Sequence, residues 1–291
     1  MEAFDYLAPR TLSEAYAHLG SGKSSLLLAG GTDVIIQLRE GRRRCDQLID
    51  LKHIPELMRL GFAADGTLEI GAATPLAEIY GNAEVARRLP GLIDAASLIG
   101  GIQIQSRASL GGNLCNASPA ADSACALIVL GAKLVIGSAS GIRELAVEDF
   151  FAGPGRSVLQ PGEILVQLKV PPQPARSGAF YHRFIPRNEM DIAVVSAGAR
   201  LQLNGSGDRI EAARVAVGAV APTPLLVAAA AAALVGQPPT DEVFETAGKA
   251  AAAASSPITD MRGSAAQRRH LASVLTVRAL RGALQRAGEA R

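Results

Sequence analysis

The feature that most limits how this chain can fold is a proline cluster at residues 171–174, Pro171-Pro-Gln-Pro174. Each proline fixes the backbone angle φ and lacks an amide hydrogen, so neither a helix interior nor a central strand can continue through the cluster. We therefore predict a domain boundary there. The chain has 291 residues, and at roughly 100–200 residues per domain this length suits two domains, or one domain with an appendage.

The segment up to residue 55 is predicted to form a small α/β unit, residues 1–55. Thr11-Leu-Ser-Glu14 is a capping box, in which a hydroxyl accepts from an amide of the first helical turn and a carboxylate reaches back. It predicts a helix over residues 12–19. Short apolar runs predict strands at 25–28, 34–38 and 47–50.

Residues 56–174 are predicted to form a second unit of helices and strands. Thr74-Pro75 and Ser118-Pro119 each place a hydroxyl cap before a proline, which suits the start of a helix because the first-turn amides have no partner there. They predict helices that run to Tyr80 and to Leu130, and a further helix is expected over 83–99. Strands are predicted at 68–71, 133–137 and 164–170.

The third unit, residues 175–291, is predicted to hold a three-stranded antiparallel sheet followed by helices. Its second and third strands flank Asn204-Gly-Ser-Gly-Asp208, which contains an Asn-Gly hairpin signal. A second capping box, Ser264-Ala-Ala-Gln267, opens the last helix. Strands are predicted at 179–184, 192–203 and 209–220. The expected fold class is α+β.

The composition excludes several classes of protein. Hydrophobic residues make up 48% of the chain and charged residues 19%, which is typical of a folded globular protein and not of a disordered or collagen-like one. The net charge is +2 and aromatic residues are 4%. We therefore expect no nucleic-acid partner.

The cysteines Cys45, Cys115 and Cys125 are odd in number and scattered. This pattern argues against a disulfide framework and against a self-contained zinc or iron–sulfur site, so no metal ligands are expected. We expect Cys115 and Cys125 to be small buried residues. No secretory signal is visible, and the longest apolar run, residues 225–235, is well short of the roughly 20 residues that span a bilayer. A soluble cytoplasmic protein without a transmembrane segment is predicted.

Two segments carry the chemistry, and the first is Ala29-Gly30-Gly31-Thr32-Asp33. Adjacent glycines leave the backbone uncovered, and consecutive amides in such a turn can form a concavity for anionic oxygens. Thr32 adds a hydroxyl donor. Taken alone, the glycine pair is also compatible with an ordinary tight turn.

The second segment runs from Ser109 through Gly111, Gly112, Asn113 and Asn116, and it is followed by Asp122. We expect another uncovered turn that leads into the first turn of a helix, where amides favour negative charge. Two such segments suggest a long anionic ligand, for example a dinucleotide with a diphosphate for the amides and ribose hydroxyls for a carboxylate. Neither segment has the G-x-G-x-x-G pattern of the Rossmann fold. Asp122 could equally be a carboxylate that only complements the helix dipole.

Several motifs, in this order and spacing, resemble the FAD-binding medium subunit of molybdenum hydroxylases, the family that includes the flavoprotein subunits of xanthine dehydrogenase and carbon monoxide dehydrogenase. They are Ala29-Gly-Gly-Thr-Asp33, Ser109-Leu-Gly-Gly-Asn113 with Ala117-Ser-Pro119 and Asp122, Pro161-Gly-Glu-Ile-Leu165 with Pro171, and Tyr181-His-Arg-Phe184 with Arg187 and Asp191-Ile-Ala193. The resemblance implies two subdomains that hold FAD between them, of the vanillyl-alcohol oxidase type, followed by a carboxy-terminal domain.

The resemblance also implies the residues of a cofactor site. Asp122 would bind on the adenosine side and Ile99 would lie beside the cofactor. Leu165 would pack near the isoalloxazine, although a core strand residue is an equally good reading. Arg183 occupies a lysine position that faces the flavin; alternatively it belongs to a solvated face. The diphosphate and ribityl chain would be lined by Leu27, Leu28, Ala29, Gly30, Gly31, Thr32, Asp33 and Val34, together with Ser109, Leu110, Gly111, Gly112, Asn113 and Asn116.

The function implied is that of a non-covalent FAD carrier in a complex. The chain would take electrons from a small 2Fe-2S subunit and pass them to an external acceptor, while a large subunit would hold the molybdopterin. A heterohexamer, a dimer of heterotrimers, is the expected assembly, and no catalytic side chain is expected in this chain. A free-standing flavin-dependent oxidase or reductase and a cofactor-free scaffold subunit remain the alternatives.

Overall fold

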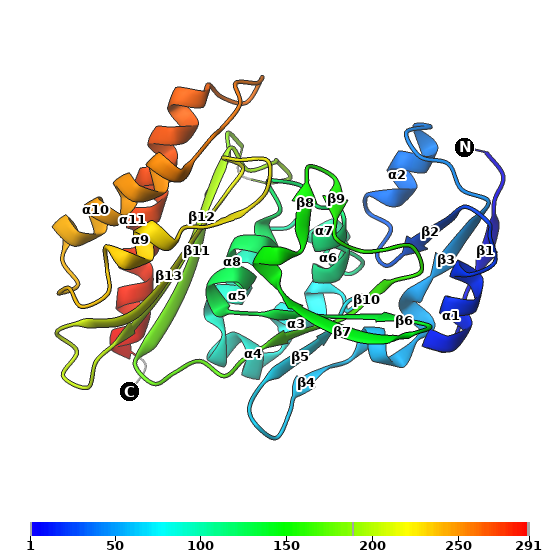
Figure 1. Cartoon of the computed structure of the whole chain (residues 1–291), viewed down its shortest axis with the longest axis horizontal. Helices are drawn as coiled ribbons and strands as arrows, with labels where there is room; N and C mark the ends of the chain where they lie inside the picture. The colour runs from blue at the N-terminus through cyan, green and yellow to red at the C-terminus, as the bar shows by residue number, and fades with distance from the viewer. Residues whose placement is uncertain (1, 188, 290–291) are drawn as a thin grey trace.

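The computed structural model describes residues 2–187 and 189–289, and its three main sheets follow one another along the long axis of the molecule in chain order (Figure 1). The amino-terminal sheet lies at one end, the central sheet in the middle and the carboxy-terminal sheet at the other end. In the described ranges, no helix combines the length and the apolar character needed to cross a bilayer.

The amino-terminal unit is a small parallel sheet with strand order β1-β3-β2. Thr11 caps its first helix as predicted, since its Oγ1 accepts from the Glu14 amide at 3.2 Å. The elements are β1 (Asp5–Leu7), α1 (Leu12–Leu19), β2 (Ser25–Leu28), α2 (Val34–Arg39) and β3 (Gln47–Asp50).

The prediction of a strand at 34–38 is wrong, because this segment forms helix α2. A short apolar run does not distinguish a strand from a helix by its period. Leu38 of this helix packs in a small cluster with Leu28 and Leu48, whereas Ile35 and Ile36 are exposed on the surface.

The central sheet has the order β4-β5-β10-β6-β7, and its pairs are antiparallel. The chain enters it through two short 3-10 turns and leaves it through β10. The elements are η1 (Leu51–His53), η2 (Pro55–Met58), β4 (Leu60–Phe62), β5 (Leu68–Gly71), β6 (Lys133–Ser138), β7 (Gly141–Ala146), η3 (Val147–Asp149), β8 (Phe151–Gly153), β9 (Arg156–Ser157) and β10 (Ile164–Val170).

Six helices lie between β5 and β6, where the sequence predicted three. Pro90 divides the helix expected over 83–99. The segment with Gly111 and Gly112 is a short helix and not an uncovered turn, and the helix expected from Ser118 begins only at Asp122. The elements are α3 (Leu76–Gly81), α4 (Ala83–Arg88), α5 (Pro90–Ala96), α6 (Ile102–Gln105), α7 (Leu110–Cys115) and α8 (Asp122–Leu130).

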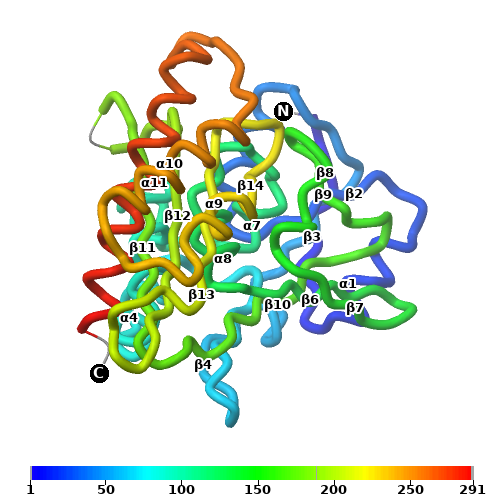
Figure 2. The backbone as a smooth tube through the Cα atoms, turned by 60° about the vertical axis from the view of Figure 1, so that its left-hand side comes forward, coloured from blue at the N-terminus to red at the C-terminus, as the bar shows by residue number. Residues whose placement is uncertain are grey.

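The carboxy-terminal sheet is antiparallel with the order β11-β12-β13-β14. It has one strand more than predicted. The extra strand, β14, follows prolines and has only two residues, so its sequence shows no recognisable alternation. Figure 2 shows α10 and α11 on one side of this sheet and α8 on the other. The elements are β11 (Ser177–Phe184), β12 (Val195–Leu203), β13 (Ile210–Gly218), β14 (Leu225–Leu226), α9 (Ala228–Ala232), α10 (Asp241–Ala254) and α11 (Ala265–Glu289).

Helix α8 lies at the centre of the molecule and all nine of its residues are buried. It packs on the carboxy-terminal sheet closely enough that a Cβ added to Gly198 of β12 would lie 2.9 Å from the Cys125 carbonyl oxygen. The central core includes α8 and continues into Tyr181 and Ala216 of the carboxy-terminal sheet. The two larger parts of the chain are therefore joined through α8.

Candidate functional site

The two glycine segments lie against each other, although about 80 residues of sequence separate them. The turn between β2 and α2 carries Gly30, and a Cβ added there would overlap the Arg107 carbonyl oxygen. A Cβ added to Gly112 of α7 would lie 3.9 Å from the Cβ of Ala29. The turn can approach the backbone at Arg107 this closely because Gly30 carries no side chain.

Gly31 has a separate role in shaping the turn. Its φ is +79°, a left-handed value that favours glycine. An added Cβ would also lie 2.9 Å from Cδ1 of Leu28. Gly31 therefore lets the chain reverse between β2 and α2, and its carbonyl accepts from the Ile35 amide at 3.2 Å.

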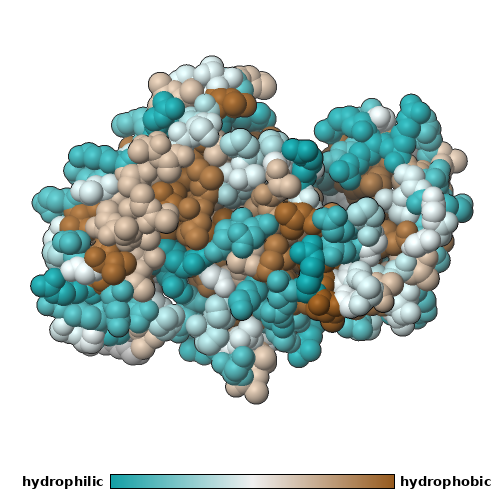
Figure 3. Space-filling model, viewed as in Figure 1, coloured by the Kyte–Doolittle hydropathy of each residue, from teal (hydrophilic) through white to brown (hydrophobic). Residues whose placement is uncertain are grey.

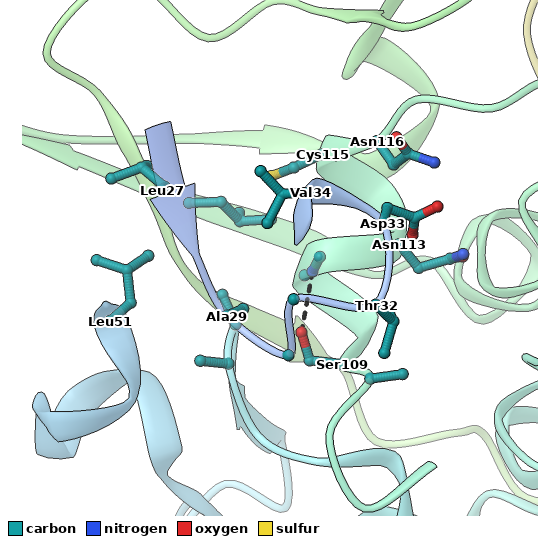
Figure 4. Close-up of a pocket in the computed structure, with 18 of the residues that line it drawn as sticks. Leu27, Ala29, Thr32, Asp33, Val34, Leu51, Ser109, Asn113, Cys115 and Asn116 are labelled. Atoms are coloured by element: carbon teal, nitrogen blue, oxygen red, sulfur yellow. Dashed lines mark hydrogen bonds between the residues drawn. The ribbon is translucent and has the colours of Figure 1, made fainter. Parts of the chain in front are cut away.

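Ser109 sets the other wall of the site. It is the N-cap of α7, and its Oγ accepts from the Gly112 amide at 3.1 Å (Figure 4). The Asn113 amide donates to the Ser109 carbonyl at 3.0 Å. The amides of Leu110 and Gly111 are first-turn amides, which an α-helix leaves without an internal partner.

Gly111 is required by packing and not only by the site. A Cβ added to Gly111 would overlap the backbone of Ala72, which follows β5. Ala72 in turn is tied to β10, because its amide donates to the Val166 carbonyl at 2.9 Å. Glycine at 111 therefore brings α7 into contact with the central sheet.

A hollow opens between the two segments, and its empty space, open mouth included, is about 1010 Å³. Figure 3 shows the surface notched beside the hydrophilic region over α2. Most residues predicted for the site line this hollow: Leu27, Ala29, Gly30, Gly31, Thr32, Asp33, Val34, Ile99, Ser109, Gly111, Gly112, Asn113, Asn116 and Leu165. Leu28 and Leu110 are buried beside it and do not line it.

Sequence reasoning missed other lining residues. Leu51 follows β3 directly, and the ends of parallel strands meet at one edge of a sheet, so its position could have been found from the topology. Gln37 and Arg43 needed α2 to be recognised as a helix. The missed residues are Gln37, Arg43, Leu51, Ala72, Ala73, Ala108, Cys115, Leu159 and Ile164. Cys115 was expected to be buried but is exposed, so that prediction is wrong, whereas Cys125 is buried as predicted.

The two sides of the hollow differ in polarity. Leu27 and Leu51 lie on one side in Figure 4, and Asp33, Asn113 and Asn116 lie on the other. The hollow thus suits an elongated ligand with an apolar part and a polar part.

Hydrogen bonds hold the amide side chains of the polar side. Asn116 Oδ1 accepts from the Gln37 side chain of α2 at 3.4 Å. Asn113 Oδ1 accepts from the Ser123 hydroxyl of α8 at 2.6 Å. These contacts connect α7 to the helices on either side of it, so the polar groups of the hollow have fixed supports.

Few ionisable groups line the hollow. Among its described lining residues these are Asp33, Arg43 and the Cys115 thiol. Burial raises the pKa of Asp33 above its ordinary value, and the nearby Arg42 guanidinium opposes this shift. The hollow thus offers mainly backbone amides, hydroxyls, amide side chains and apolar walls.

Asp122 and Arg183 do not line the hollow. Asp122 Oδ2 accepts from Arg183 Nη1 at 2.6 Å, and its Oδ1 accepts from the Tyr181 hydroxyl at 2.5 Å. The Arg183 and Asp122 side chains are 4% and 9% exposed. The pair joins α8 to β11 beside the hollow, and the cofactor contacts implied for these two residues stay predictions.

Comparison with known protein families divides the chain at the same place as the proline cluster. Residues 2–173 match the family model described as "FAD binding domain in molybdopterin dehydrogenase". Residues 180–283 match the model described as "CO dehydrogenase flavoprotein C-terminal domain".

Similar proteins cover nearly the whole chain. A xanthine dehydrogenase FAD-binding subunit of Escherichia coli O157:H7 is 34% identical, and the match covers 97% of this chain and 97% of the relative's length. The carbon monoxide dehydrogenase medium chain of Hydrogenophaga pseudoflava is 32% identical, and the match covers 97% of this chain and 98% of the relative's length.

Solved structures agree with these sequence matches. A chain of carbon monoxide dehydrogenase from Hydrogenophaga pseudoflava superposes with a TM-score of 0.93 at 32% identity, covering 98% of both chains. A chain of quinoline 2-oxidoreductase from Pseudomonas putida 86 gives a TM-score of 0.91 at 29% identity and covers 98% of both. The chain therefore belongs to the family of FAD-binding medium subunits of molybdenum-containing dehydrogenases.

Proposed function

We propose that this chain binds FAD non-covalently in the hollow between its two glycine segments and serves as the electron outlet of a molybdenum hydroxylase. The observation that carries this proposal is the hollow itself, which joins the backbone of the glycine turn and of the first turn of α7 to an apolar wall. The relatives support it, because their names describe FAD-binding subunits and medium chains of dehydrogenases.

The polarity of the hollow suggests how FAD would lie in it. Backbone amides in the two segments, together with Thr32 and Ser109, would receive the diphosphate, because amides and hydroxyls donate to anionic oxygens. Leu51 and Leu165 would pack near the isoalloxazine on the apolar side. The turn at Gly30 and Gly31 would let the backbone approach the phosphates.

The chain would contribute binding and orientation rather than acid–base chemistry. Bound FAD supplies the redox chemistry, and the protein determines where the cofactor lies and what surrounds it. The lining groups that could move a proton are few, so we assign no catalytic side chain. This disfavours a free-standing oxidase, which would need its own substrate pocket.

We further propose the assembly and organisation expected from the family. The chain would join a large molybdopterin subunit and a small 2Fe-2S subunit in a dimer of heterotrimers. Three units, 1–55, 56–174 and 175–291, each contain one main sheet, and the first two would hold FAD between them in the manner of the vanillyl-alcohol oxidase fold. A cytoplasmic location suits the three cysteines, none of which is in a disulfide in the described structure.

Titration of the purified chain with FAD tests the proposed function. We expect the protein to take up one FAD and to show flavin absorption bands after removal of free cofactor. A folded, colourless preparation that takes up no FAD would instead support the scaffold alternative. A yellow protein that oxidises a small substrate without partner subunits would support a free-standing enzyme.

A further inference from the structure

The first glycine segment rests on a lysine from the neighbouring strand end. Lys52 lies in η1, immediately after β3, and its Nζ donates to the Ala29 carbonyl at 2.8 Å. The same Nζ donates to Asp50 Oδ1 at 2.6 Å. The Lys52 side chain is 18% exposed and that of Asp50 is 5% exposed, so this ion pair is largely shielded from solvent behind the turn.

Asp50 is itself held on two sides. Its Oδ1 accepts from the Lys52 amide at 3.0 Å, and its Oδ2 accepts from the Tyr6 hydroxyl of β1 at 2.5 Å. Burial acts to raise the pKa of Asp50, but hydrogen bonds from Lys52 and Tyr6 outweigh it, so the pKa lies below its ordinary value. Asp50 is therefore a carboxylate at neutral pH and keeps the Lys52 ammonium in place.

The contact at Ala29 controls the peptide group that opens the glycine turn. No cis peptide occurs in the described chain, and in a trans peptide the carbonyl and the following amide point in opposite directions. When Lys52 holds the Ala29 carbonyl on one side of the turn, the Gly30 amide must point to the other side. Ala29 and Gly30 both line the hollow.

We propose that Lys52 is a positioning residue for cofactor binding, one that fixes the Ala29–Gly30 peptide so that the Gly30 amide faces the diphosphate. This inference rests on the proposed function. In its support, Lys52 reaches the turn from η1, and in the described contacts its side chain donates only to Ala29 and Asp50.

The test compares K52M with wild type in FAD titrations followed by flavin fluorescence. Methionine keeps an unbranched apolar stem and removes the charge and the donor. Without the Lys52 contact, the orientation of the Ala29–Gly30 peptide is no longer fixed, so we expect the Kd for FAD to rise at least about tenfold, which is about 1.4 kcal/mol. At saturating FAD, the flavin absorption spectrum should match that of wild type, because Lys52 does not line the hollow.

Two further variants separate positioning from folding. K52M leaves Asp50 buried without its cation, which can lower stability by itself. The double variant D50N/K52M removes both charges. It should recover stability to urea and keep the weak FAD binding of K52M. K23M is the matched control, because Lys23 forms an exposed pair with Asp5, at 2.9 Å, in the same unit; its Kd should equal that of wild type.

The proposal is overturned if K52M binds FAD within twofold of wild type, or if D50N/K52M recovers wild-type affinity. It is also overturned if K23M weakens binding as much as K52M, or if the saturated K52M spectrum differs from wild type. A wild-type protein that takes up no FAD would instead refute the proposed function.

Discussion

At the scale of single residues, glycines determine whether the site can form. Gly30 and Gly111 allow backbone contacts that no side chain could accommodate, at Arg107 and at Ala72. The contact at Gly30 brings the turn against the segment before α7, and the contact at Gly111 brings α7 against the central sheet. The glycines thus have a structural role beside the binding role that the sequence suggested.

The substitution G30A tests this role. An added methyl group would overlap the Arg107 carbonyl, so the turn and the segment before α7 must separate. We expect a loss of about 1–3 kcal/mol in the free energy of unfolding, as for an overpacked site, together with weaker FAD binding. Urea unfolding and FAD titration provide the two measurements.

Gly61 in β4 offers a control for G30A. An added Cβ there meets nothing within 4 Å, so G61A should change stability by much less. Equal stability and equal FAD affinity in G30A and wild type would show that the close contact at Gly30 does not matter.

At the scale of helices and strands, ion pairs join the central part of the chain to the carboxy-terminal part. Asp122 at the start of α8 pairs with Arg183 of β11 at 2.6 Å. Asp94 of α5 pairs with Arg286 of α11 at 2.5 Å. Both link elements that are far apart in sequence, so they favour one arrangement of the two parts.

The substitution D122A tests the buried pair. It would leave the Arg183 guanidinium buried without a counter-charge, and breaking such a pair by removing one partner costs about 3–5 kcal/mol. We expect that loss in the free energy of unfolding measured by urea. D241A removes the partner of Arg281 in a pair whose side chains are 60% and 53% exposed, and it should cost no more than about 1 kcal/mol. Similar losses in the two variants would contradict the assigned role of Asp122.

Sequence reasoning succeeded where the signal is local. The capping hydroxyls of Thr11 and Ser264 mark the starts of α1 and α11. Thr11 Oγ1 accepts from the Glu14 amide, and Ser264 Oγ accepts from the Gln267 amide at 3.1 Å. It failed at α2, because Val34 to Leu38 are apolar in a pattern that suits either a strand or a helix. It also could not place the Lys52 contact with Ala29 or the Asp122 pair with Arg183, since both depend on tertiary packing.

At the scale of the whole molecule, the hollow depends on the meeting of the first two units, 1–55 and 56–174. The amino-terminal parallel sheet supplies the β2–α2 turn and Leu51, and the central unit supplies α7, Ile164 and Leu165. The carboxy-terminal sheet packs on α8, behind α7, and supplies none of the described lining residues. A ligand in the hollow would therefore contact both of the first two units and link them.

A crystal structure of the protein with bound FAD tests the central claim most directly. We predict that the diphosphate oxygens lie within about 3.2 Å of backbone amide nitrogens in both residues 30–33 and residues 110–112. A diphosphate bound elsewhere, with neither of these segments in contact with it, would contradict the claim.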